Sequence, residues 1–115
     1  DPLEADVDDN ILNEFDRQEV RNEKKEFLDM YIDHMDKILL TSFKKSEEIM
    51  VADAILTVFR RREHLEIFNK KAIYIYIREI TGMETTTITK VVKVMKKIFN
   101  DCYSEYLETG YIYKQ

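Results

Sequence analysis

The chain has 115 residues, of which 44% are hydrophobic and 36% are charged, with a formal net charge of −5 at pH 7. This length suits one domain with one core, and the absence of a long apolar run or a signal-peptide pattern argues against a membrane protein. The single cysteine, Cys102, excludes an internal disulfide. We therefore expect a soluble, cytoplasmic protein.

The composition is typical of helical proteins, because only one proline and two glycines interrupt a chain rich in Glu, Lys, Ile and Leu. It predicts an all-α fold with four main helices. Charge is unevenly distributed, since residues 1–36 carry 13 acidic and 4 basic side chains, whereas residues 37–115 carry 10 acidic and 14 basic ones. The two parts are expected to face different partners or each other.

The first stretch, residues 1–17, is acidic with few apolar residues, which predicts a tail or a short docking helix. An all-helical domain is expected over residues 18–115. Its first helix is predicted from Gln18 to Leu40, where apolar residues recur at steps of three and four. These residues are Phe27, Leu28, Tyr31, Met35, Ile38 and Leu39.

A second helix is predicted from Ser46, which would be its N-cap, with acidic residues in the first turn. Its inward face would be formed by Ile49, Ala52, Leu56 and Phe59. The three arginines Arg60, Arg61 and Arg62 would close its last turns, where cations are favoured.

A third helix is predicted from Lys70, capped by Asn69. Its segment AIYIYI, residues 72–77, also has the alternation of a β-strand. We favour a helix, because Ile73, Ile77 and Ile80 align at helical spacing. Gly82 is expected to end this helix in the left-handed conformation.

The last helix is predicted from Thr85 to Leu107, stopped by Gly110. Its inner face would be formed by Ile88, Val91, Val92, Met95, Ile98, Phe99 and Cys102. Residues 111–113 would either start a short strand, as an incomplete wing, or fold back.

Two helices joined by a short turn that starts with glycine are typical of a helix-turn-helix, whose second helix enters the major groove of DNA. Apolar anchors are expected before, within and after this turn: Ile77, Ile80, Met83, Ile88 and Val91. One departure from the motif is Arg78, which occupies an inner position where a small residue is usual.

At 100° per residue, Thr86, Lys90, Lys93 and Lys97 form one stripe opposite the apolar face. Hydroxyl groups near a helix N-terminus suit phosphates and base edges, and lysines suit phosphates. We predict Thr85, Thr86, Thr87 and Thr89 at or near bases, and Lys90, Lys93 and Lys97 at phosphates. The second basic cluster would support the DNA backbone: Arg60, Arg61, Arg62, Lys70 and Lys71.

The segment from Lys70 to Phe99, KKAIYIYIREITGMETTTITKVVKVMKKIF, resembles the helix-turn-helix core of transcription regulators. Residues 46–113 are similar, as an overall impression, to the C-terminal portion of late-transcription sigma factors of tailed phages. The resemblance implies binding to promoter DNA, with RNA polymerase or another protein as a partner of the acidic N-terminal region. It also implies the cytoplasm of the host cell if the protein is phage-encoded.

Plain helical packing gives the same spacing, and a row of lysines is often only a solvated face. The alternative function is a helical protein-interaction or assembly domain that does not bind DNA. In that case AIYIYI and the tyrosines of the last helix would form an oligomer interface, such as that of a homodimer.

The remaining sequence patterns do not indicate a metal site or a catalytic site. Neither His34 nor His64 has a companion at metal-ligand spacing, and three aspartates, Asp29, Asp33 and Asp36, are read as a solvated acidic face. No nucleophile with an orienting base and no phosphate-binding glycine loop is present. We therefore expect no cofactor and no enzymatic activity.

Overall fold

The computed structural model describes residues 25–62 and 70–112, and all regular structure within them is helical. Four helices follow in chain order: α4 (Lys25–Ser42), α5 (Ser46–Arg60), α6 (Lys70–Thr81) and α7 (Thr85–Thr109). For this part of the chain the prediction of an all-α fold with four main helices is confirmed. The predictions for residues 1–24, for the Asn69 cap and for Tyr113 lie outside the described residues.

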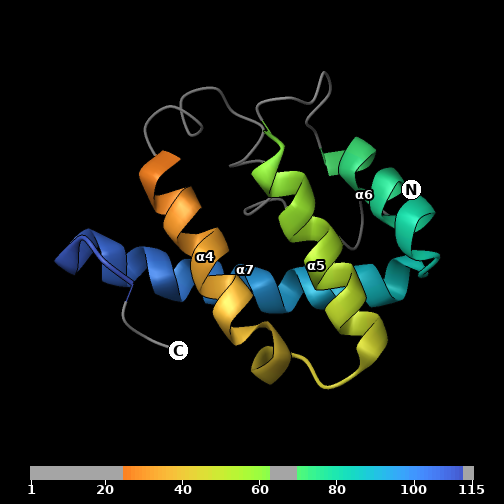
Figure 1. Cartoon of the computed structure of the whole chain (residues 1–115), viewed down its shortest axis with the longest axis horizontal. Coiled ribbons are helices and arrows are strands. Elements are labelled where there is room, and N and C mark those ends of the chain that lie inside the picture. The colour runs from red at the N-terminus through yellow and green to blue at the C-terminus, as the bar shows by residue number, and fades with distance from the viewer. Residues whose placement is uncertain (1–24, 63–69, 113–115) are drawn as a thin grey trace.

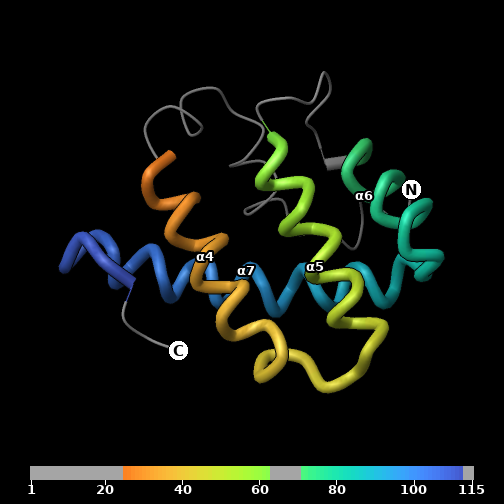
Figure 2. The backbone as a smooth tube through the Cα atoms, in the orientation of Figure 1, coloured from red at the N-terminus to blue at the C-terminus, as the bar shows by residue number. Residues whose placement is uncertain are grey.

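Helix α7 is the longest, with 25 residues, and it organises the arrangement of the other helices. It runs across the molecule behind α4 and α5, while α6 lies at the end where α7 begins (Figure 1). The backbone trace shows that α5 lies between α4 and α6 (Figure 2). Accordingly α5 contacts all three other helices, and α7 also packs against α4 and α6.

One hydrophobic core is shared by all four helices. The whole apolar face predicted for the first helix is buried in α4, and AIYIYI is helical, with Ile73, Tyr74 and Ile77 inside. The largest fully buried side chains are Tyr31, Tyr74, Phe27, Phe59, Leu28, Met35, Leu56, Ile77 and Ile88.

An aromatic cluster holds the second half of α7 against α4. The ring centroid of Phe27 lies 5.2 Å from that of Phe99, with the rings edge to face, and 5.0 Å and 5.2 Å from those of Tyr103 and Tyr106. Nearby, the buried Tyr31 hydroxyl donates a hydrogen bond of 2.9 Å to the Met95 carbonyl oxygen. Burial raises the pKa of Tyr31 well above its ordinary value, so this hydroxyl keeps its proton and remains a donor.

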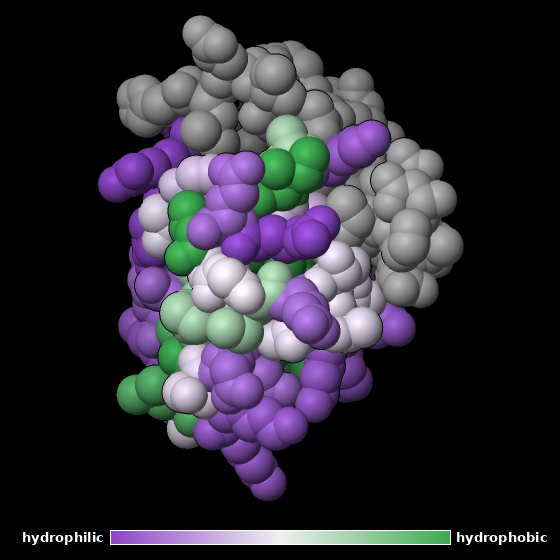
Figure 3. Space-filling view, turned by 90° about the vertical axis from the view of Figure 1, so that its right-hand side faces the viewer, coloured by the Kyte–Doolittle hydropathy of each residue, from purple (hydrophilic) through white to green (hydrophobic). Residues whose placement is uncertain are grey.

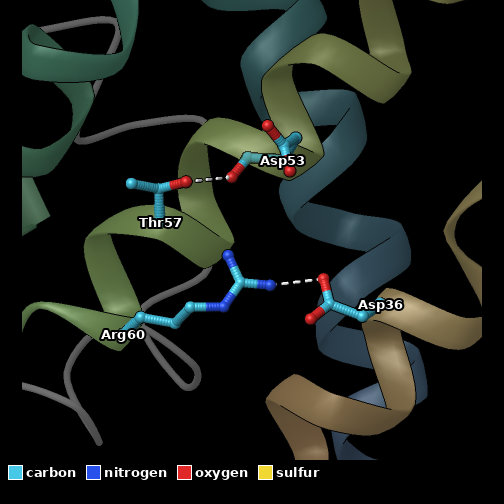
Figure 4. A network of polar contacts seen from close by, with 4 residues as sticks. All are labelled: Asp36, Asp53, Thr57 and Arg60. Carbon is cyan, nitrogen blue, oxygen red and sulfur yellow. Dashed lines mark hydrogen bonds and ion pairs between the residues drawn. The ribbon is translucent and has the colours of Figure 1, made fainter.

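Ion pairs join α4 to the end of α5. Arg60 reaches from α5 to the carboxylate of Asp36 on α4, and within α5 the Thr57 hydroxyl donates to the Asp53 carbonyl oxygen (Figure 4). The Arg62 guanidinium lies 3.0 Å from the Asp29 carboxylate. Two of the three aspartates read as a solvated face therefore pair with arginines at the end of α5 and just after it.

Two local predictions were wrong. Ser46 is the first helical residue and not the N-cap, which is Lys45 with no side-chain cap hydrogen bond. Ile80 is 49% exposed and does not anchor the turn. Of the two alternatives for the residues after Gly110, the strand is not formed at Tyr111 and Ile112, so the described residues contain no part of a wing.

None of the four described helices has both the length and the apolar character needed to cross a membrane.

Candidate nucleic-acid interface

The connection between α6 and α7 is a turn of three residues, Gly82 to Glu84. Gly82 has φ of 69°, and its amide donates a 2.9 Å hydrogen bond to the Arg78 carbonyl oxygen, which ends α6. Only glycine adopts this left-handed conformation without strain from a Cβ atom. The prediction for Gly82 is confirmed.

The hydroxyl of Thr81 fixes the geometry of this turn, a role that the sequence analysis did not assign. It donates to the Ile77 carbonyl oxygen over 2.6 Å and accepts a hydrogen bond from the Met83 amide over 3.1 Å. The Thr81 side chain is buried, so water does not compete for these bonds. In the sequence, the only indication of this role is a threonine directly before Gly82.

The crossing of α6 over the start of α7 is packed by apolar side chains. Ile77, Ile88 and Val91 are buried, and Met83 packs partly buried against them. Arg78 is exposed and does not enter this contact. The expectation that Arg78 occupies an inner position of the motif is therefore wrong, because its side chain faces outward.

The four threonines at the start of α7 have different surroundings. Thr86 is exposed, and Thr85 and Thr87 are half-buried. Thr89 is only 7% exposed, and its hydroxyl oxygen has no hydrogen-bond partner among the described residues. Thr89 therefore does not share the outer face with Thr86, because residue 89 is turned towards the core next to Ile88.

The three predicted phosphate-binding lysines are all exposed on α7, but their partners differ. Lys90 Nζ lies 3.0 Å from a Glu48 carboxylate oxygen, and Lys97 Nζ lies 3.5 Å from that of Asp101. Lys93 forms no ion pair within the described part of the chain.

The partner of Lys90 is a carboxylate that is almost buried. The hydrogen bond from Lys90 lowers the pKa of Glu48, outweighing the burial that would raise it. If Lys90 turned to a phosphate, this carboxylate at the boundary of the core would lose its ammonium partner and keep only its weaker interactions with Lys45. We therefore assign Lys90 to the contact between α5 and α7.

The pair between Lys97 and Asp101 is different, since these side chains are 80% and 59% exposed. An exposed ion pair contributes roughly 0–1 kcal/mol, so a phosphate can replace the Asp101 carboxylate at little cost. Lys97 is accordingly available for binding, as is Lys93.

A surface hollow of about 420 Å³ marks this section of α7. It is lined by Lys93, Lys96, Lys97, Asn100 and Asp101. Three of these residues are lysines and one is an aspartate, which pairs with Lys97. This composition suits an anion such as a phosphate group.

Two residues of the second basic cluster form ion pairs within the fold. Arg60 pairs with Asp36, and Arg62 is 6% exposed and donates to the Phe59 carbonyl oxygen over 2.7 Å as well as to Asp29. Arg61 and Lys71 are exposed. Lys70 is the first residue of α6.

Metal chemistry finds no support in the described residues, where no group of three His, Cys, Asp or Glu side chains could hold an ion. No protein-family model, no curated protein and no solved structure matches the chain. The resemblances to helix-turn-helix regulators and to phage sigma factors thus stay predictions.

Proposed function

We propose that α6 and α7 act as a helix-turn-helix that binds double-stranded DNA in transcription, with the outer face of α7 towards the groove. The observation that carries this proposal is the shared exposure of Thr86, Lys93 and Lys97 on one helix that follows a three-residue glycine turn. Hydroxyl groups lie near its N-terminus and cations further along.

The order of these groups matches the needs of DNA binding. The Thr86 hydroxyl and methyl groups can meet base edges, including a thymine methyl, while Lys93 and Lys97 neutralise phosphates. Thr85 and Thr87, half-buried on either side of Thr86, border the same contact. Thr89, Lys90 and Arg62 are left out of the proposed contacts, because Thr89 and Arg62 are buried and Lys90 pairs with a nearly buried carboxylate. Arg60 pairs with Asp36 in an exposed ion pair, so it stays available to a phosphate as Lys97 does.

The remaining cations lie outside this face. Arg61 is exposed and supplements the phosphate contacts, whereas the exposed Lys71 lies on the outer side of α6 and is left out of them. A regulator or a sigma-like factor also needs a protein partner, and the acidic region before residue 37 is the part of the chain with the charge to bind a basic surface, such as one on RNA polymerase.

The test is fluorescence anisotropy of a labelled duplex of random sequence, titrated with the protein at several salt concentrations. With two phosphate contacts from Lys93 and Lys97, the logarithm of the binding constant should fall with the logarithm of salt with a slope of about −2 or steeper. No binding at low salt would overturn the proposal.

The second candidate is the protein-interaction or assembly domain. It is favoured by the outer side of α6, where Ile75, Tyr76 and Ile80 are exposed. This alternative predicts association that depends on protein concentration together with indifference to DNA, so the same titration and a sedimentation measurement separate the two functions.

A further inference from the structure

Helix α6 is amphipathic, but its outer side carries large apolar side chains as well as charged ones. Its inner face, with Ile73, Tyr74 and Ile77, is buried in the core. On the outer side, Ile75 and its neighbour Tyr76 are 43% and 42% exposed, whereas Ile80, 49% exposed, lies about 140° from Ile75 around the helix. Two adjacent large apolar side chains are more than a single exposed residue of the kind that any surface carries.

The surroundings of these residues are mixed in character. The space-filling view of the side on which α6 lies shows separate hydrophobic areas among hydrophilic surface (Figure 3). Apolar side chains with a polar border are typical of a surface that binds another protein.

Two charges on the outer face are placed symmetrically about Ile75, whereas the exposed Arg78, about 60° from Ile75, has no counterpart. Lys71 lies four residues before Ile75, and Glu79 lies four residues after it. Both side chains are exposed, and neither forms an ion pair with another described residue. At 100° per residue, all three lie within an arc of about 80° on the helix surface.

We propose that the outer face of α6 binds the same face of a second copy of this chain, with the two helices antiparallel about a two-fold axis at Ile75. This goes beyond DNA binding and does not depend on it. A two-fold contact uses the same surface on both copies, so each favourable pair occurs twice. Here Lys71 meets Glu79 of the second copy, and Glu79 meets its Lys71.

The apolar residues fit the same arrangement. On the two-fold axis, Ile75 packs against Ile75 of the second copy, and Tyr76 lies beside it on both helices. The antiparallel direction also sets the positive end of each helix dipole beside the negative end of the other. A parallel arrangement would instead bring like charges together at Lys71 and at Glu79.

The size of this surface sets the strength of association. Stable interfaces bury about 800 Å² on each partner, and one face of a 12-residue helix offers less. We therefore expect a weak, reversible dimer whose population rises with protein concentration.

Sedimentation velocity without DNA, from low micromolar to submillimolar protein, tests the proposal through charge exchange. The variants Lys71→Glu and Glu79→Lys should each be more monomeric than the natural chain, because each brings like charges together. Both changes suit the dipole of α6, so neither should unfold it. Circular dichroism checks this point.

Two further samples identify the contact. The double variant K71E/E79K restores opposite charges and should regain the association of the natural chain. A mixture of the two single variants should associate more strongly than either one alone, since both of its charge pairs are complementary. These results are not expected from a contact anywhere else on the surface.

The apolar part has a matched control. Ile75→Gln should reduce association, whereas Leu107→Gln, at a residue 66% exposed on α7, should leave it unchanged. A natural chain that stays monomeric throughout, or a dimer indifferent to the charge exchange, would overturn the proposal. DNA binding could still be present in either case, so the two proposals fail separately.

Discussion

Cationic side chains serve different purposes in two regions of the molecule. The first region is the contact between α4 and α5, and the second is formed by the outer faces of α6 and α7. At the first, Arg60 and Arg62 meet Asp36 and Asp29 across two helices, and Arg62 is buried in doing so. On the second, Lys93 projects from α7 and forms no ion pair with a carboxylate of the described residues. The comparison teaches that the group opposite a cation decides whether the cation stabilises the fold or is free to bind a ligand. Its place in a basic run of the sequence does not decide this.

The largest expected effect comes from the aromatic cluster that both regions depend on. Phe27→Ala removes a fully buried ring in contact with Phe99, Tyr103 and Tyr106, and should lower the free energy of unfolding by about 3–5 kcal/mol. Urea denaturation measures it, with Leu107→Ala as the exposed control. A loss below about 1 kcal/mol would show that α4 does not hold α7 in this way.

Substitution of an arginine tests the comparison through a change in unfolding free energy of intermediate size. Arg62→Met keeps an apolar stem but removes the hydrogen bonds to Phe59 and Asp29, and should cost about 1–2 kcal/mol of unfolding free energy. Arg61→Met, at the exposed neighbour, should stay within about 0.5 kcal/mol of the natural chain. Equal effects in urea denaturation would contradict the assignment of Arg62 to the fold.

The threonines allow a test in which stability is not expected to fall. Thr89→Val removes a buried hydroxyl that has no partner among the described residues, so stability should be unchanged or rise by up to about 1 kcal/mol. DNA affinity should stay the same, whereas Thr86→Val should weaken it. A clear loss of DNA binding in Thr89→Val would return that residue to the interface.

The smallest effect concerns His34, which is nearly buried on α4. Burial lowers the pKa of its imidazole, Glu105 opposes this shift, and Lys37 adds to it. Because the folded chain binds this proton less readily than the unfolded one, stability should fall as pH drops from about 7 to about 5. His34→Gln should flatten this part of the pH profile, as measured by thermal unfolding, and an unchanged profile would exclude His34 as its source.

Much of the fold follows from periodicity and from glycine. The inner faces of α4 and α7 were predicted because steps of three and four residues mark one side of a helix, and Gly82 was predicted because its conformation excludes most other residues. AIYIYI was ambiguous in sequence, and its helical form depends on burying Ile73, Tyr74 and Ile77 in the core.

The errors have a common physical origin. Spacing tells which side of a helix is apolar, but not which helix covers it or how far the cover extends. Ile80 has the spacing of an inner residue but is exposed, whereas Thr89 and Arg62 are polar but buried. The pairing of Lys90 with Glu48 joins residues 42 positions apart, and no local pattern contains that information.

The most direct test of the central claim compares the salt dependence of DNA binding in two double variants of equal charge. Lys93→Ala with Lys97→Ala removes two cations from α7, and Lys37→Ala with Lys44→Ala removes two exposed cations from α4 and the residues after it. The account predicts weaker binding and a salt slope reduced in size by about 2 for the α7 variant, with the other close to the natural chain. Equal slopes for the two variants would contradict the claim that the outer face of α7 binds the phosphates.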